Sequence, residues 1–286
     1  ISLAACAIVV DTQRQTARVI NCGFPIPFYC GKQKTHLLLD QGSSPLGWFP
    51  DPDLRVTVVP IVDGGTITLW SDGVEDLAAS LGVDPHGLTL ALRRSIAAGH
   101  RHPEFLRGAR DDIMSIVVRT DVDPSTSINE EILLRQTVRG NTETQINDYQ
   151  EFWARTLNLA LPDLPEAIRY AILLCTREAV LNALKHGCKG NANHAALLEM
   201  SVQQDSSRVQ VYISDPGDGH VFDLDDYEQQ ASADMLTEHR GLILISHLCD
   251  QLISERNGAE LTLVFNLNPE FVSDLPSHAS ALQSRT

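Results

Sequence analysis

The chain has 286 residues, of which 43% are hydrophobic, and carries a formal net charge of −15 at pH 7. A chain of this length can bury a sizeable core and is expected to form two domains. The negative charge argues against broad contact with nucleic acid or an anionic membrane, because both need clustered Lys and Arg. No run reaches the roughly 20 apolar residues of a membrane helix, and the basic start of a secretion signal is missing. We therefore expect a cytoplasmic protein.

The first part of the chain, residues 1–119, is rich in short β-branched runs separated by turn residues, which predicts a β-rich domain. One helix is expected near residues 85–98, with Asp84 as its N-cap and a proline in its first position. Asp, Pro, Ser and Thr then occur together without periodicity in residues 120–131, as in a linker. The opening residues resemble the middle of a strand, so further sequence upstream of Ile1 is expected.

The second part of the chain has a different pattern. It alternates strand-like runs with helical segments, and the helices are expected near residues 144–158, 163–187 and 241–252. Helices mixed with antiparallel strands predict an α/β sandwich, in which helices cover one face of a sheet. We therefore expect an α+β protein, with a β-sandwich first and an α/β sandwich in residues 132–268. Residues 269–286 are rich in Ser and are expected to form a frayed tail.

Four short motifs follow one another in the first part, at residues 21–27, 42–47, 69–76 and 110–113. Each alone is better explained by a structural role, since Asn-x-Gly and Ser-Asp-Gly are common turn sequences and Asp111-Asp112 could simply open a strand. Carboxylates at two strand ends can nevertheless share a hard divalent ion such as Mg²⁺ or Mn²⁺, and a metal-activated water can attack a phosphate ester. The candidate carboxylates are those of Asp72, Asp111 and Asp112.

In this order the four motifs resemble the second half of a PPM-type serine phosphatase of the stress and sporulation regulator kind. The resemblance covers residues 1–119 and implies that Asp72 and Asp111 are metal ligands, with Asp112 beside them. The earlier strands of that family carry a Gly-Asp metal segment that this sequence does not contain. The implied phosphatase site, which would use Mn²⁺ or Mg²⁺, is therefore incomplete within these residues.

The long helix of the second part carries polar residues on an apolar face. At 100° per residue, Asn182 and His186 fall on the apolar stripe of this helix, and Glu178 lies at its edge. Burying an amide without a partner costs roughly 1–3 kcal/mol, so Asn182 must be paired with protein, water, metal or ligand. On this helix alone, a structural hydrogen bond near the helix end explains the pattern better than a ligand does.

Two further motifs favour a ligand. A strand-like run ends in Asp215-Pro216-Gly217-Asp218-Gly219, where glycine allows close approach to a flat ligand and a carboxylate can accept from an amine such as adenine's. Such a hairpin is also a common turn. Arg240-Gly241 then opens a helix whose N–H groups suit a phosphate chain. The acidic residues 221–237 between them are expected to form a lid.

In this order the motifs of residues 132–268 resemble the GHKL ATP-binding fold, and residues 178–187 are similar to the N box of the anti-sigma-factor serine kinases. The resemblance implies ATP with Mg²⁺, with Asn182 holding the metal and Asp215 binding the adenine amine. It also implies that Glu178 is the general base toward a serine or threonine hydroxyl of a partner protein.

The same resemblance implies two sets of residues that contact the nucleotide. Gly217 and Gly219 would line the adenine pocket, and Arg240 and Gly241 would lie at the phosphates.

Together the two resemblances imply a bacterial partner-switching regulator, whose phosphatase and kinase act on an anti-sigma-factor antagonist. A sigma factor is a second implied partner, an upstream sensory or receiver domain follows by analogy alone, and homodimer formation is left open. The alternative is a non-catalytic module that binds a sigma factor or antagonist, with a degenerate phosphatase. Glu178 discriminates between them, since a pure binder needs no base beside Asn182. A histidine kinase is disfavoured, because no dimerising helical hairpin with an acceptor histidine precedes residue 132.

Overall fold

The computed structural model describes a chain made of two compact units. The described residues are 3–31, 36–38, 42–51, 53–61, 65–100, 103–120, 130–140, 143–191, 193–203, 207–219 and 240–267. The first unit comprises Ile1–Leu81 and Ser95–Asn129, and the second comprises Gly82–Arg94 and Glu130–Thr286. Both contain helices and mainly antiparallel strands, which confirms the predicted α+β class in two parts. None of the helices among these residues is long and apolar enough to cross a membrane.

The first unit is a sandwich of two four-stranded sheets. One sheet contains β1 (Ala5–Asp11), β2 (Thr16–Cys22), β5 (Gly42–Ser43) and β6 (Val56–Pro60), and the other has the order β4 (His36–Leu38), β3 (Phe28–Gly31), β7 (Gly65–Trp70) and β8 (Ser115–Arg119). Val19 of β2, Tyr29 of β3 and Ile67 of β7 share one buried core, so the two sheets pack face to face. Helix α1 (Asp72–Leu81) follows β7 directly.

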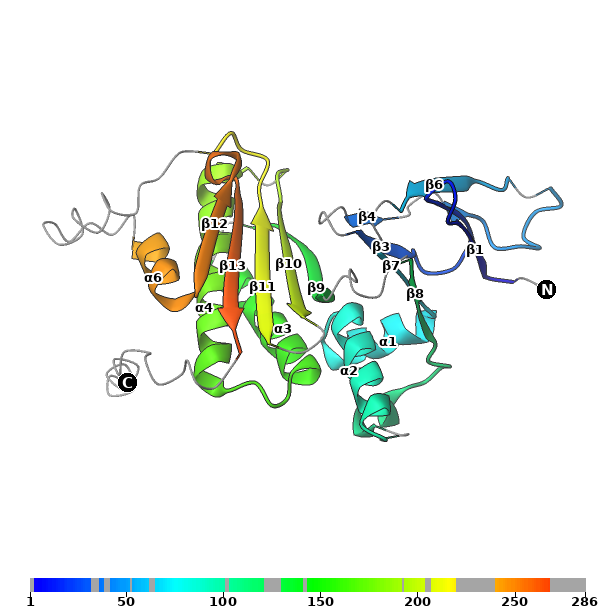
Figure 1. Ribbon diagram of the computed structural model, residues 1–286, viewed down its shortest axis with the longest axis horizontal. Coiled ribbons are helices and arrows are strands. Elements are labelled where there is room, and N and C mark those ends of the chain that lie inside the picture. Colours follow the sequence, from blue (N-terminus) through cyan, green and yellow to red (C-terminus); the bar gives the residue numbers. More distant parts are fainter. Residues whose placement is uncertain are drawn as a thin grey trace, which may run out of the picture. The chain divides into compact units, whose positions relative to one another are not determined.

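The second unit is built on one antiparallel sheet with the strand order β12-β13-β11-β10-β9. The strands are β9 (Glu130–Val138), β10 (Ala196–Gln203), β11 (Arg208–Ser214), β12 (Gln251–Glu255) and β13 (Glu260–Asn266). The helices are α3 (Glu143–Ala160), α4 (Glu166–Asn182) and α6 (Arg240–Leu248), and α3 and α4 cover one face of the sheet (Figure 1). Trp153, Ile172 and Leu198 are fully buried in the core between these layers, which is the predicted α/β sandwich.

Two predicted boundaries differ in this unit. The long helix does not stay α-helical to its end, because Ala183–Gly187 form a π-helical turn after Asn182. The last helix ends at Leu248 instead of near residue 252, because the next residues form the edge strand β12. Asp250 begins that pairing, with its N–H donating to the Val264 carbonyl at 2.8 Å.

Helix α2 (Pro85–Ala97) differs from the expected domain organisation. The Asp84 carboxylate accepts from the His86 N–H at 2.8 Å, as expected of an N-cap. The sequence places α2 in the first domain, but the structure groups Gly82–Arg94 with the second unit. The physical reason is burial, since Leu90 belongs to the same hydrophobic core as Leu133. Most of the predicted linker and the whole predicted tail lie outside the described residues.

Candidate active site

Asp215 lies at the end of β11 and lines a cavity of about 160 Å³. Its backbone N–H donates to the Ala259 carbonyl at 3.0 Å, and its Oδ1 accepts from the Gly217 N–H at 2.9 Å. Burial raises the pKa of the Asp215 carboxyl above its ordinary value, although the Gly217 N–H and the Arg256 guanidinium act in the opposite direction. A ligand amine that donates to this carboxylate would stabilise its charge inside the cavity.

Three glycines surround Asp215 where a side chain would not fit. A Cβ on Gly187 would overlap the Asp215 carboxylate, and a Cβ on Gly217 would lie 2.9 Å from its Oδ1. Gly219 has a φ of 70°, and a Cβ there would overlap the Asn257 carbonyl. Gly217 and Gly219 are predicted site residues, whereas Gly187 was interpreted only as the end of a helix. The structure makes Gly187 a part of the site, because it lets the helix end pass against Asp215.

Glu178 and Asn182 lie one turn apart on α4, as predicted, and both line a second cavity next to the first. Asn182 lines both cavities. Arg177 holds Glu178 in place, since its guanidinium lies 3.2 Å from Glu178 Oε1 and both side chains are about three-quarters buried. The two cavities therefore meet at Asn182, with Asp215 on one side and Glu178 on the other.

The start of α6 packs against these two side chains. A Cβ added to Gly241 would lie 3.1 Å from Glu178 Oε2 and 3.5 Å from Asn182 Nδ2. Glycine at this position therefore lets the positive end of the helix approach the polar face of α4. Arg240 is the first residue of α6, but its side chain and the predicted lid at residues 221–237 lie outside the described residues.

Two lysines follow Asn182 and line the second cavity. The whole chain contains four lysines among its 22 basic residues, and two of them, Lys185 and Lys189, lie here. Lys189 lines both cavities and has a left-handed φ of 52° after the π-helical turn. His186 lines the first cavity but is exposed, which corrects the expectation that it lies on a buried stripe. The junction of the cavities thus carries positive charge that suits a phosphate chain.

The predicted metal ligands of the first unit lie on two segments that touch. The Ser71 hydroxyl donates to the Asp112 carbonyl at 2.8 Å and accepts from the Met114 N–H at 3.0 Å. These bonds bring the backbone around Asp72 next to the backbone around Asp111. Both aspartates are exposed. Each carboxylate also accepts a bond from the N–H of the following residue, at 3.0 Å for Asp72 and 2.7 Å for Asp111.

The other two motifs of this unit also lie side by side. The Asn21 side chain exchanges two hydrogen bonds with the Phe24 backbone, at 2.9 and 3.0 Å. The Gly23 N–H donates to the Ser43 carbonyl at 3.0 Å, and the φ of Gly23 is 72°. These contacts build a tight turn, so the role of this pair of motifs in the described residues is structural.

Comparisons with known proteins match two parts of the chain to two different families. Residues 2–123 match the family described as Stage II sporulation protein E (SpoIIE), and residues 141–265 match the family described as Histidine kinase-like ATPase domain. We call these two parts the SpoIIE region and the ATPase domain, after the families that they match. The resemblances inferred from the motifs are thereby confirmed for both parts.

One solved structure is similar to both parts together. It is the crystal structure of the RsbU and RsbW domains of Rv1364c from Mycobacterium tuberculosis, at 15% sequence identity and a TM-score of 0.33. The similarity covers 92% of this chain and 69% of that chain. A comparison with curated proteins gave no match.

The donor set of the ATPase domain fits Mg²⁺ bound together with a nucleotide. Within the described ranges, no group of three or more His, Cys, Asp or Glu side chains could hold a metal by itself. Mg²⁺ is commonly bound by one or two protein oxygens together with substrate phosphates and water. The amide oxygen of Asn182, at the junction of the two cavities, suits such a site.

In the part that the structure describes, the SpoIIE region contains too few ligands to complete a metal site. Asp72 and Asp111 lie on adjoining segments, but among the described residues they do not form a group of three or more His, Cys, Asp or Glu side chains that could hold a metal. A two-metal phosphatase site needs more oxygen ligands than two carboxylates supply. The two aspartates therefore fit as part of a metal centre and do not complete one.

Proposed function

We propose that the ATPase domain binds Mg²⁺-ATP across the two joined cavities and phosphorylates a serine or threonine of a partner protein. The observation that supports this most directly is the position of Asn182, between the buried Asp215 carboxylate and the Glu178 carboxylate. Adenine would donate its amine hydrogen to Asp215, and the phosphates would pass Asn182 and Lys189. The γ-phosphate would then reach the cavity that contains Glu178, beside the N-terminus of α6.

The transfer step follows from this placement. Glu178 would accept the proton of the incoming hydroxyl while the hydroxyl oxygen forms a bond to the γ-phosphorus. The bond between that phosphorus and the β,γ-bridging oxygen breaks, and ADP leaves with the electron pair. Arg177 orients Glu178 for this role, since it holds one carboxylate oxygen at 3.2 Å and leaves the other beside Gly241. Bound Mg²⁺ would neutralise the charge that develops on the phosphates.

The SpoIIE region would catalyse the opposite reaction. Asp72 and Asp111 would be two of the ligands of Mn²⁺ or Mg²⁺, and a metal-activated water would hydrolyse phosphoserine on the same partner. The remaining ligands would come from outside the described residues. A kinase and a phosphatase on one chain suit a partner-switching regulator in the cytoplasm, with an anti-sigma-factor antagonist as the substrate and a sigma factor as a second partner.

The experiment that tests this uses the purified chain, radiolabelled ATP with Mg²⁺, and antagonist proteins encoded in the same genome. Glu178→Gln should reduce phosphoryl transfer by at least about 100-fold, the lower range for losing a general base, while ATP affinity changes little. Asp215→Asn should instead weaken ATP binding. If ATP binds but no transfer depends on Glu178, the kinase proposal fails, and the alternative of a non-catalytic binding module holds.

A further inference from the structure

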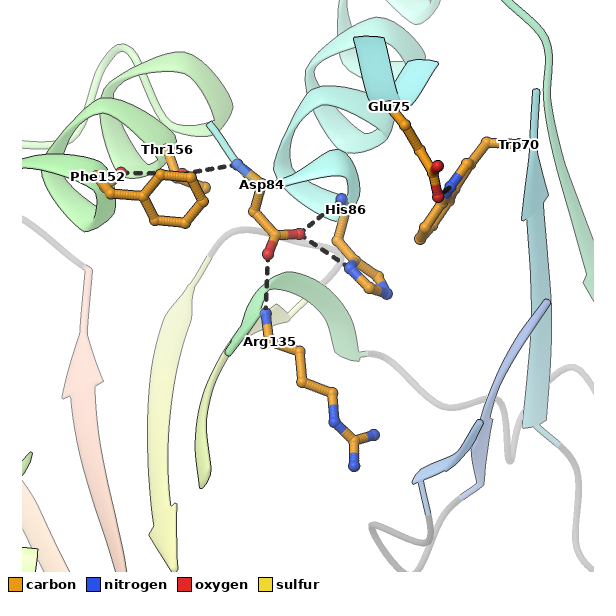
Figure 2. Close-up of polar contacts among 7 residues, drawn as sticks. All are labelled: Trp70, Glu75, Asp84, His86, Arg135, Phe152 and Thr156. Atoms are coloured by element: carbon orange, nitrogen blue, oxygen red, sulfur yellow. Dashed lines mark hydrogen bonds and ion pairs between the residues drawn. The ribbon is translucent and has the colours of Figure 1, made fainter. Parts of the chain in front are cut away.

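The segment Gly82–Arg94 is attached to the ATPase domain by a buried aspartate (Figure 2). Asp84 is 5% exposed, and its Oδ2 accepts from the Arg135 N–H of β9 at 3.3 Å. Its own N–H donates at 3.0 Å to the hydroxyl of Thr156, which in turn donates to the Phe152 carbonyl at 3.1 Å. Asp84 thus joins the start of α2 to both β9 and α3.

Asp84 contacts β9, which is an edge strand of the sheet. β9 is the last strand of the five, and Leu133 is an extra residue in its pairing with β10, because Leu134 pairs with Met200 and Ile132 with Ser201. Such bulges leave backbone groups without a partner strand. A Cβ added to Gly87 of α2 would lie only 2.9 Å from the Leu133 carbonyl oxygen. Helix α2 therefore covers the edge of β9 at its irregular point.

The apolar contacts bind the same segment to α3. Leu90 is 3% exposed and lies in one core cluster with Trp153 and Leu157 of α3. At the end of the segment, the Arg94 guanidinium donates to the Ala160 carbonyl at 3.3 Å. The C-terminal part of α3 therefore shares a core with a helix that the family comparison places in the SpoIIE region, residues 2–123.

The other end of α3 lies at the catalytic cavity. Ile146, in the first turns of α3, lines the cavity that contains Glu178 and is fully buried. Trp153 then ties α3 to β9, since its indole N–H donates to the Gln136 side-chain oxygen at 2.7 Å. Helix α3 thus reaches from the cavity to the residues that contact Gly82–Arg94. No residue of α2 lines either cavity.

We propose that Gly82–Arg94 acts as a clip through which the SpoIIE region and the nucleotide site influence each other: docking of the clip on β9 and α3 and binding of nucleotide favour one another. The proposal rests on the proposed binding of ATP. Because linkage is reciprocal, the chain with its clip undocked must bind nucleotide more weakly, by the factor by which nucleotide favours docking. The clip follows α1 in the chain, and α1 begins at the predicted metal ligand Asp72.

The test compares nucleotide affinity with exchange of the clip's amide hydrogens in the full chain. The probe is the non-hydrolysable analogue AMP-PNP with Mg²⁺, measured by calorimetry and by hydrogen exchange with mass spectrometry. In the unchanged protein, nucleotide should slow exchange in residues 84–94 at least threefold. Asp84→Asn and Thr156→Val, which remove polar contacts of the clip at nearly constant volume, should each weaken nucleotide binding at least threefold.

Asp148→Asn is the matched control for Asp84→Asn. It makes the same change at an exposed position of α3 that lines neither cavity, and it should leave nucleotide affinity and clip exchange unchanged. If either clip variant removes the exchange protection of residues 84–94, so that the clip is undocked, but keeps full nucleotide affinity, the clip is only structural and the coupling is refuted. Absence of AMP-PNP binding to the unchanged protein would instead refute the proposed ATP site. Thr156→Val, the milder change, decides the matter if Asp84→Asn does not fold.

Discussion

Gly187→Ala tests the geometry of the adenine end of the site. The added methyl group would overlap the Asp215 carboxylate, whereas ordinary carbon contacts are about 3.5–4.0 Å long, so the carboxylate must move by about 1 Å or more. That movement breaks its bond from the Gly217 N–H and removes the acceptor from adenine. A hydrogen bond to a charged group contributes about 1.5–3 kcal/mol, so ATP should bind roughly 10- to 150-fold more weakly.

The assay compares ATP with inosine triphosphate by calorimetry. Inosine carries a carbonyl oxygen where adenine carries its amine, so the unchanged protein should bind ATP more tightly. Gly187→Ala should lose this preference, because Asp215 no longer accepts from the amine. A general loss of folding would instead lower the fraction of active protein for both nucleotides and would appear in the thermal unfolding curve.

Gly190→Ala is the control in the same turn. Gly190 also has a positive φ, of 67°, but a Cβ there would meet nothing within 4 Å. Its backbone strain should cost about 1 kcal/mol of stability and leave the nucleotide preference intact. The reasoning is refuted if Gly187→Ala binds ATP as tightly as the unchanged protein and still prefers it to inosine triphosphate.

Three other outcomes are expected. If Lys189 binds the phosphates as proposed, Lys189→Gln should weaken ATP binding about tenfold while adenosine affinity stays constant in the same titration; equal losses for both ligands would contradict this role. Burial raises the pKa of Asp215, so on acidification the affinity for ATP should begin to fall at a higher pH than it would with an ordinary carboxyl, whose pKa is near 3.8. Asp215→Asn should abolish this pH dependence. The stability of the fold depends on pH in the opposite direction. Protonation of Asp215 stabilises the folded protein, and this contribution is complete below the pKa of Asp215 in the unfolded chain and is lost as pH rises through its pKa in the folded protein. Asp72→Ala and Asp111→Ala should abolish Mn²⁺-dependent phosphate release from the phosphorylated antagonist by the full-length protein, and unchanged release would remove both from the metal site.

The sequence was sufficient where the relevant contact is local. Glu178 and Asn182 are one helical turn apart, so their shared face follows from the period of an α-helix. Gly217 and Gly219 could be assigned because they follow a strand within a few residues. Gly187 could not, since its reason for being glycine is Asp215, 28 residues further along the chain. Only the fold brings the end of one helix against the end of a neighbouring strand.

Element ends were missed for the same reason. The segment after Leu248 is apolar enough to extend a helix, and only its pairing with β13 makes it the strand β12. Likewise, α2 has the caps and apolar face of an ordinary helix, which indicate its existence but not what covers that face. One oxygen of Asp84 has its predicted role as N-cap of α2. The other oxygen accepts a hydrogen bond from Arg135 of β9, and no pattern in the sequence around Asp84 indicates this distant contact.

The family boundary and the physical boundary of this chain therefore differ for a specific reason. Sequence similarity follows the order of residues, so residues 2–123 match one family without interruption. Buried contacts follow packing, and Leu90 packs with Leu133 and Trp153 in the core of the other unit. Deleting a buried leucine typically costs about 2–5 kcal/mol, a large share of the stability of one domain. An ATPase domain cut before β9 would lose that contact together with the helix that covers its edge strand, so it should be less stable than one that includes Gly82–Arg94.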